Sequence, residues 1–187
     1  MAPRLKEKFN ATIVEKAKSE FSIKNPMALP RLDKIIVTVG MGHQLEGTKL
    51  NAGAKEQVLD DMALICGQRA VVKKAKKSVS NFNIRQGYEI GAMTTLRGNR
   101  MWEFLDRLIS MCIPRIKDFR GLRLKSFDGR GNYCFGITEQ GVFPEINMAS
   151  VKFTHGMNIN LVFRNSTDER SQFVLREIGL PFERDED

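Results

Sequence analysis

The 187-residue chain is long enough for one generous domain, and its 42% hydrophobic content is that of a packed protein, which excludes intrinsic disorder. Because no apolar run approaches the roughly 20 residues of a membrane span, insertion into a bilayer is excluded as well. The net charge of +8 indicates a polyanionic partner, with nucleic acid expected before an acidic membrane surface. The first ten residues lack the apolar core of a secretory signal, so we expect a cytoplasmic protein.

The first third of the chain predicts two helices and a strand between them. Apolar residues recur every four positions over residues 5–21, which is typical of an amphipathic helix. The segment 31–40 is rich in β-branched residues and lies between a proline and a glycine, so it predicts a strand. A second apolar stripe predicts a helix from about Thr48 to Cys66, with Gly67 just beyond its end.

The middle of the chain predicts a hairpin followed by a helix and a loop. Segments 68–73 and 88–98 have strand composition and flank a basic segment, so we expect them to pair across a long loop. Asn99 is a good N-cap for a third helix, which must end before Pro114. Residues 115–131 show no period and contain three glycines, which indicates a loop.

The last third predicts two more strands and a final helix. Segments 132–138 and 157–163 alternate between apolar and polar residues as half-buried strands do. The tetrad STDE, residues 166–169, matches a capping box that opens a helix ending at Gly179. Strands and helices mix without regular βαβ spacing. The expected fold class is therefore α+β: a single domain over residues 1–187, with a largely antiparallel sheet, helices packed on one face and a long basic loop.

Catalytic and metal-binding patterns are weak in this sequence. Cys66, Cys112 and Cys134 are odd in number and widely spaced, which favours reduced, buried thiols over disulfides or a zinc site. His43 and His155 lie more than 100 residues apart, and we interpret both as surface or turn residues. We therefore expect no enzyme, no cofactor and no metal site.

Two glycine-rich segments raise the question of phosphate binding. VGMGHQL, residues 39–45, begins as a dinucleotide turn, but Leu45 takes the third glycine position and the next helix begins too late. We interpret Gly40 and Gly42 as turn glycines; a nucleotide-dependent enzyme using this turn, with His43 as its base, is the alternative function. FDGRGNY, residues 127–133, precedes a strand and so is no P-loop, although its amides could line an anion-binding nest beside Arg130.

The positive charge is concentrated in one part of the chain. Residues 69–131 contain 15 Lys and Arg against 5 Asp and Glu, whereas the remainder contains 15 basic and 17 acidic residues. Within this block, VKKAKKSVSNFNIRQG (residues 72–87) adds Ser and Asn for sugars and base edges and Phe82 for stacking. Folded RNA is recognised by that combination of groups, and the sequence shows no signature of a DNA-binding motif.

Several long motifs also carry a family likeness. LPRLDKIIVTVGMG, ALICGQRAVVKKAKKSVSNFNIRQGYEIGAMTTLRGNRMWEFLDRL, PRIKDFRGL, SFDGRGNY and FPEI follow one another along the chain. They resemble the bacterial large-subunit (50S) ribosomal protein number five family, the 5S-rRNA-binding proteins of the central protuberance. The resemblance implies an α+β fold and a structural, cytoplasmic role in the ribosome. The implied partners are 5S rRNA, P-site tRNA, 23S rRNA, a small-subunit head protein at an intersubunit bridge, and other proteins of the central protuberance.

The same resemblance assigns residues to these contacts. The 5S rRNA surface would include Thr38, Gln68 and Thr95. Thr38 stands where the family usually has Asn, so it keeps one hydroxyl but lacks the amide's paired donor and acceptor. Met93 and Gly141 also depart from the family pattern, which has a basic residue and Leu there. The loop over residues 73–87 would contact tRNA through Lys73, Lys74, Lys76, Lys77, Ser78, Asn81, Phe82 and Arg85. Further RNA contact candidates are Arg97, Arg120 and Arg130.

Overall fold

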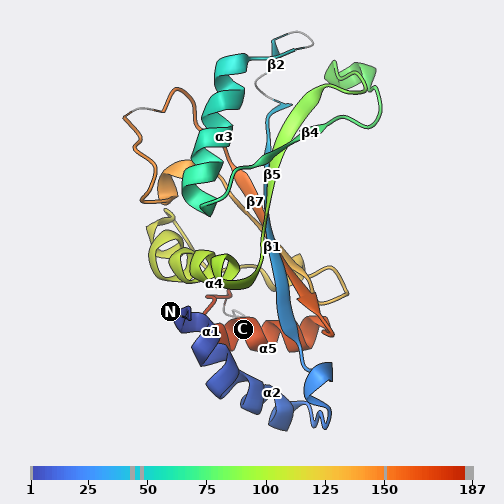
Figure 1. The fold of residues 1–187 in the computed structure, drawn as a ribbon, viewed down its shortest axis with the longest axis vertical. Helices are drawn as coiled ribbons and strands as arrows, with labels where there is room; N and C mark the ends of the chain where they lie inside the picture. The colour runs from blue at the N-terminus through green and yellow to red at the C-terminus, as the bar shows by residue number, and fades with distance from the viewer. Residues whose placement is uncertain (1, 43–44, 47–48, 150, 184–187) are drawn as a thin grey trace. The chain divides into compact units, whose positions relative to one another are not determined.

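A computed structural model describes residues 2–42, 45–46, 49–149 and 151–183. The fold is α+β, as predicted, with an antiparallel five-stranded sheet in the order β4-β5-β1-β7-β6 (Figure 1). The strands of this sheet are β1 (Arg31–Gly40), β4 (Val71–Lys74), β5 (Glu89–Leu96), β6 (Tyr133–Ile137) and β7 (Met157–Arg164). A separate antiparallel pair joins β2 (Leu45–Glu46) to β3 (Lys49–Leu50). No helix in the described part of the chain is long and apolar enough to span a membrane.

In the described part of the chain, a helical segment occurs at each of the four predicted places, although two of them begin at other residues than predicted. The first consists of α1 (Arg4–Lys8), a π-helical turn (Phe9–Ile13) and α2 (Val14–Glu20). The others are α3 (Ala52–Cys66), α4 (Gly98–Arg107) with a π-helical turn (Leu108–Cys112), and α5 (Asp168–Ile178). Single 3-10 turns occur at Pro26–Ala28, Ser80–Phe82, Ile113–Arg115, Leu124–Ser126 and Gln140–Val142.

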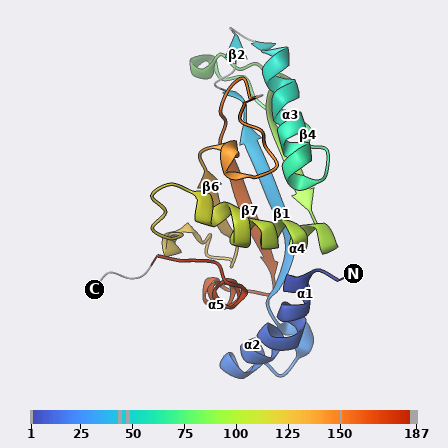
Figure 2. The same cartoon turned by 90° about the vertical axis from the view of Figure 1, so that its left-hand side faces the viewer.

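The chain forms two compact units, and strands of the main sheet contribute to both. Unit 1 consists of Met1–Ile35, Leu96–Phe135 and Asn160–Asp187, and unit 2 of Ile36–Thr95 and Gly136–Ile159. In unit 1, α5 packs against the first helix (Figure 2). The ring centroids of Phe21 and of Phe173 on α5 lie 5.5 Å apart and support this packing. The first helix also contacts α4, since the ring centroids of Phe9 and Trp102 lie 5.2 Å apart.

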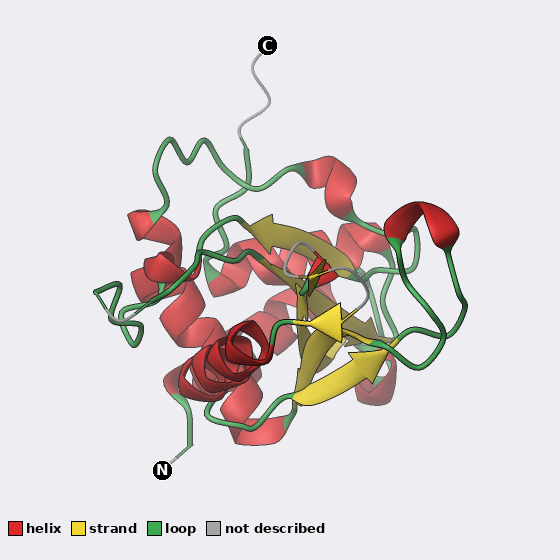
Figure 3. Ribbon diagram, turned by 90° about the horizontal axis from the view of Figure 1, so that it is seen from above, coloured by secondary structure: helices red, strands yellow, loops and turns green. Residues whose placement is uncertain are grey.

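In unit 2, α3 runs along one side of the strands (Figure 3). Its apolar stripe, which includes Val58, Met62 and Ile65, is fully buried. A helix with apolar residues at this spacing stabilises the fold by burying that stripe against a sheet. The strands contribute the matching apolar residues, with Val37 of β1 and Ile159 of β7 both 0% exposed.

Two predicted helix starts were wrong. The second helix begins at Ala52 and not near Thr48, because Asn51 is its N-cap: Asn51 Oδ1 accepts hydrogen bonds from the backbone N–H groups of the first turn. Thr48 itself lies outside the described residues. The third helix begins at Gly98 with Arg97 at the N-cap position, so Asn99 lies within the first turn and does not cap it. Asn99 Oδ1 instead accepts a hydrogen bond from Lys6 Nζ at 3.1 Å.

The histidine and cysteine predictions were correct only in part. His155 is buried and not a surface residue, because its Nε2 lies 3.1 Å from Oδ2 of buried Asp61 on α3. Cys66 and Cys112 are buried as expected, whereas Cys134 is exposed, since it alternates on β6 with buried Tyr133. His43 lies outside the described residues.

The predicted capping box does not form at the start of α5. Thr167 is the N-cap and makes no side-chain capping bond, while Ser166 Oγ lies 2.7 Å from Ser171 Oγ. Asp168, one of the two acidic residues of the first turn, binds a different segment of the chain. Its carboxylate accepts hydrogen bonds from the backbone N–H groups of Gly129, at 3.0 Å, and Gly131, at 2.6 Å.

This contact answers the question raised by the FDGRGNY segment. Its amides do bind an anion, but the anion is the Asp168 carboxylate of the same chain. A second carboxylate, Asp128, accepts hydrogen bonds from the backbone N–H of Arg130 and from Asn132. Desolvation acts to raise the pKa of Asp128, but these hydrogen bonds together hold that pKa below its ordinary value. The predicted nest beside Arg130 is therefore already satisfied within unit 1.

We predict that Asp168→Ala lowers the free energy of unfolding by about 2 kcal/mol, because two backbone donors lose a charged acceptor. Urea denaturation of the purified protein measures this quantity. Glu169→Ala is the matched control, since it removes an exposed carboxylate from the same helical turn. An equal loss of stability in both variants would attribute the effect to the helix dipole and not to the loop.

Candidate nucleic-acid interface

One face of the unit 2 strands carries small and polar residues instead of a helix-contacting core. In β1, Val37 and Val39 are buried, while Thr38 between them is partly exposed. In β7, Met157 and Ile159 are buried, while Asn158 is exposed. Successive side chains of a strand point to opposite faces of the sheet. The residues that alternate with the buried ones, as Thr38 and Asn158 do, therefore lie together on one surface. Half-buried Ile36 and Met93 follow the same alternation as these residues. We call the small and polar part of this surface the open face; it consists of Thr38, Gly40, Thr95, Gly136, Thr138, Gly156 and Asn158.

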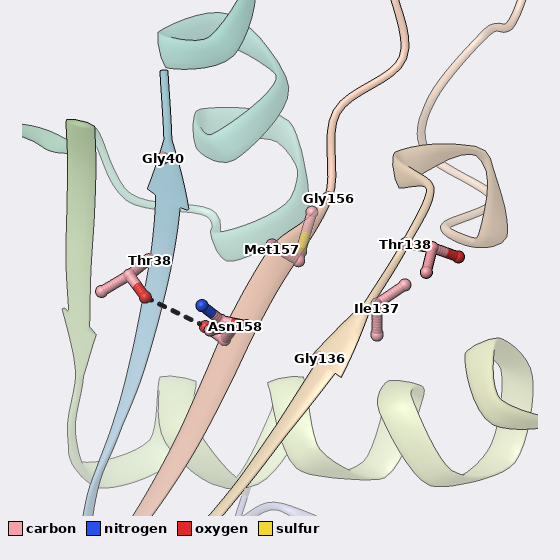
Figure 4. Close-up of a pocket in the computed structure, with 8 residues that line it drawn as sticks. All are labelled: Thr38, Gly40, Gly136, Ile137, Thr138, Gly156, Met157 and Asn158. Atoms are coloured by element: carbon pink, nitrogen blue, oxygen red, sulfur yellow. Dashed lines mark hydrogen bonds between the residues drawn. The ribbon is translucent and has the colours of Figure 1, made fainter. Parts of the chain in front are cut away.

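The open face is hollowed where β1, β7 and β6 lie together (Figure 4). This hollow has a volume of about 260 Å³ and is lined by Thr38, Gly40, Gly136, Ile137, Thr138, Gly156, Met157 and Asn158. Thr38 Oγ1 donates a hydrogen bond to the backbone carbonyl of Asn158 across 3.5 Å. A bond of that length is weak, so the hydroxyl can exchange this acceptor for a better one.

Gln68 and Thr95 lie close together, as the sequence interpretation requires, but they serve the fold directly. Gln68 follows α3, after Gly67 in the left-handed conformation with φ of 62°. Its Nε2 donates to the backbone carbonyl of Thr95 at 3.3 Å, which ties the end of α3 to β5. Thr95 alternates with buried Thr94 and Leu96 and therefore shares the open face with Thr38.

The strands β4 and β5 pair in an antiparallel hairpin as predicted, and the basic loop, residues 73–87, begins within it, because Lys73 and Lys74 are the last two residues of β4. The ladder extends beyond the strands, because the backbone N–H of Ala75 donates to Tyr88 O at 2.7 Å. Farther out, Val79 and Ile84 form an isolated antiparallel bridge with hydrogen bonds of 2.8 and 3.1 Å. Asn83 closes the tip in the left-handed conformation, with φ of 54°. The loop is thus built in two hydrogen-bonded tiers.

The polar and charged side chains of the basic loop are exposed, whereas Ala75 is buried. Phe82 at the tip is 69% exposed. Among the described residues no carboxylate pairs with the loop cations, which are Lys73, Lys74, Lys76, Lys77 and Arg85. Glu89, the acid at the base of the hairpin, is paired with Lys55 of α3 at 2.7 Å. The loop therefore presents uncompensated positive charge and an exposed aromatic ring together, beside exposed Ser78 and Asn81.

The three further arginine candidates belong to unit 1. Arg97 Nη1 lies 3.1 Å from Asp33 Oδ2, and Arg164 pairs with the other oxygen of that carboxylate, also at 3.1 Å. Part of the Arg97 charge is thus used within the protein. Arg120 and Arg130 are exposed in the loop that precedes β6. The structure groups Thr38, Gln68, Thr95 and the basic loop in unit 2, and these arginines in unit 1.

Sequence reasoning missed several residues of the open face. Gly40 was interpreted as a turn residue, but it is the last residue of β1 and borders the hollow. Asn158 was placed in a strand but given no role, although alternation with Met157 and Ile159 already directed it to the polar side. Gly136 carried no local signal, because a glycine in a strand is informative only when its neighbours across the sheet are known.

Comparison with known proteins gives a consistent result over nearly the whole chain. The family model "Ribosomal protein L5" matches residues 25–85, and the model "ribosomal L5P family C-terminus" matches residues 89–182. The large ribosomal subunit protein uL5 of Campylobacter jejuni subsp. doylei is 48% identical over 179 residues, covering 96% of this chain and 97% of the relative. The protein of the same name from Bifidobacterium adolescentis is 47% identical, covering 96% and 93%, respectively. That from Anaeromyxobacter sp. (strain K) is 46% identical, covering 97% and 99%.

We predict that Gln68→Ala lowers the free energy of unfolding by about 1 kcal/mol, because the Thr95 carbonyl loses its side-chain donor. Thr95→Val removes only the hydroxyl and keeps a β-branched side chain, so the stability should change by less than about 0.5 kcal/mol. Chemical denaturation of the two variants beside the wild-type protein measures both effects. A Gln68→Ala variant as stable as the wild type would mean that this hydrogen bond contributes nothing to the fold.

Proposed function

Since this chain belongs to the ribosomal protein L5 family, we propose that it is a structural, non-enzymatic constituent of the large ribosomal subunit that binds 5S rRNA through the open face of unit 2. The observation that carries the proposal is the combination of this partly exposed face of small and polar residues with a basic loop whose cations have no carboxylate partner among the described residues. Both features belong to the same compact unit.

The chemistry of the open face suits RNA better than an acidic protein or a lipid. Thr38, Thr95 and Asn158 offer neutral donors and acceptors on a surface interrupted by glycines, so a ribose or a base edge can approach the backbone closely. The amide of Gln68 donates to the Thr95 carbonyl and so holds the β5 backbone in place at this position. Affinity then comes from many modest contacts on a preformed surface.

The basic loop has a different composition and, in our proposal, a different target. Its lysines attract phosphates without reading sequence, and the exposed ring of Phe82 can stack on an unpaired base or ribose. We assign the loop to P-site tRNA, as the family likeness implies. Further partners in the proposal are 23S rRNA, near Arg120 and Arg130, a small-subunit head protein at an intersubunit bridge, and other central-protuberance proteins. The place of action is the cytoplasmic ribosome.

No observation favours the alternative, a nucleotide-dependent enzyme using the VGMGHQL turn. A dinucleotide site requires a helix N-terminus directly after the turn. Here β2 and β3 intervene, and α3 begins only at Ala52. We therefore propose a single, structural function.

The direct test is to purify the tagged protein from growing cells and to sequence the RNA bound to it. We expect 5S rRNA to be strongly enriched, and the protein to sediment with large subunits until it is released by high salt. Recovery of the protein free of ribosomes, with no enriched RNA, would contradict the proposed function.

We predict that 5S rRNA binding by the free protein weakens steeply as salt rises from about 50 to 200 mM, because phosphates neutralised by Lys and Arg release counterions on binding. A filter-binding or fluorescence titration over this range measures the slope of log Kd against log salt. An affinity nearly independent of salt would show that phosphate contacts are not the main source of binding. Lys55→Gln is not a suitable control for the loss of one positive charge, because Lys55 pairs with Glu89 and its removal would leave that carboxylate without its partner.

We predict that shortening the basic loop separates tRNA binding from 5S rRNA binding. Replacing residues 76–87 by Asn-Gly leaves Ala75 facing Tyr88, the geometry of a two-residue hairpin, so the strand register is retained. The variant should bind 5S rRNA with only a modest electrostatic loss, whereas ribosomes reconstituted with it should hold P-site tRNA less well.

The matched control keeps the loop and changes only its charge. Lys76→Gln, Lys77→Gln and Arg85→Gln together preserve the Val79–Ile84 bridge while removing three cations. We expect an intermediate loss of tRNA affinity, with the remainder due to Phe82 and Asn81. Abolition of 5S rRNA binding by the shortened loop, with tRNA affinity intact, would reverse the two assignments.

A further inference from the structure

The hollow of the open face is lined entirely by neutral groups. Thr38 and Thr138 contribute hydroxyls and Asn158 a carboxamide, while the other lining residues are three glycines, Ile137 and Met157 (Figure 4). None of these eight residues carries a charge. A phosphate placed here would lose hydration without gaining a cation. The volume of about 260 Å³ is below the roughly 300–1,000 Å³ of pockets that enclose drug-sized ligands, so the hollow suits one planar ring edge.

Asn158 is the side chain that gives this hollow a directional hydrogen-bonding pattern. It is exposed, and it is the only carboxamide among the lining residues. Gly136 on β6 leaves the room its amide occupies, because a Cβ at position 136 would stand 3.2 Å from Asn158 Oδ1. An amide pairs a donor with an acceptor, which matches the adjacent donor and acceptor on the edge of a nucleobase.

The glycines of the hollow differ in what the fold requires of them. A Cβ at Gly156 would lie 2.9 Å from the carbonyl oxygen of Ile137, so the backbone itself excludes a side chain there. A Cβ at Gly40 would meet no atom within 4 Å. Packing within the protein therefore does not explain why position 40 is a glycine. A ligand group that enters the hollow would explain it, because a side chain at this position would take up the same space.

From these observations we infer that the hollow receives the edge of one unstacked nucleobase of 5S rRNA, and that Asn158 is the residue that recognises it. The inference rests on the proposed function. The weak hydrogen bond of Thr38 to the Asn158 carbonyl leaves that hydroxyl free to turn to the same base. Unpaired bases with exposed edges are the elements that proteins recognise in folded RNA.

The first test is Asn158→Ala in the full-length protein, titrated with the 5S rRNA transcribed from its own genome. We expect the affinity to fall about tenfold, because base hydrogen bonds are lost. The slope of log Kd against log salt should stay unchanged, since no phosphate contact is removed. Asn160→Ala is the matched control: it removes the same amide from the same strand face, outside the hollow, and should bind as the wild type does.

The second variant, Gly40→Val, fills the hollow without removing any polar group. It should fold normally, since its Cβ has open space, and should weaken 5S rRNA binding at least as much as Asn158→Ala. Circular dichroism and thermal melting verify the fold. Chemical probing of Watson–Crick edges identifies the base: one nucleotide protected by the wild-type protein should become reactive with either variant. Deoxy substitution at that nucleotide tests whether its ribose hydroxyl is recognised instead.

Several results would overturn the inference. A salt slope reduced by about one in Asn158→Ala would identify a phosphate contact, and an effect of the deoxy nucleotide without base protection would identify a ribose. Equal losses in Asn158→Ala and Asn160→Ala would remove any special role of the hollow. Wild-type binding in both hollow variants would contradict this inference alone, whereas failure of the wild-type protein to bind 5S rRNA would contradict the proposed function itself.

Discussion

The two-residue period of the strands is the constraint on which the rest of this structure depends. In unit 2, Val37, Val39, Met157 and Ile159 must lie on one face to bury their side chains with α3. The same geometry directs Thr38, Gly40 and Asn158 to the other face, where the chain supplies small and polar groups. A one-residue shift of register would exchange these sets and remove the core and the open face together.

The proposed RNA-binding surface therefore follows from the way the core is arranged. No loop or lid has to close over the open face, since β1, β5, β6 and β7 position its groups directly. Residues on a rigid sheet are held more precisely than residues on flexible segments. In the proposed interface, side chains as short as Thr and Asn are sufficient, because the backbone would bring them within reach of the RNA and glycines leave no larger side chain between.

Local periodicity was enough to predict the main elements and their pairing across the basic loop. It failed where a distant residue decides the outcome. The STDE tetrad has the composition of a capping box, yet Asp168 binds loop amides that lie 37 and 39 residues away. His155 could not be recognised as buried, because its partner Asp61 lies 94 residues away. For the candidate site, the resemblance supplied Thr38, Gln68 and Thr95, but the hollow beside Asn158 exists only once β1, β7 and β6 are adjacent. Alternation predicts which side a residue faces, and it does not predict which residues will be its neighbours there.

The two tiers of hydrogen bonds in the basic loop bear on the entropy of association. A flexible segment of this length would lose roughly 1–2 kcal/mol of conformational freedom per residue on becoming ordered against a partner. Here the Ala75–Tyr88 contact and the Val79–Ile84 bridge have already fixed much of that backbone. The loss of backbone conformational entropy therefore occurs once, when the chain folds, and is not repeated each time a partner binds. A partner that binds and dissociates repeatedly can then be bound by a few lysines and one aromatic ring. Its dissociation rate would be set by those side-chain contacts and not by unfolding of the loop.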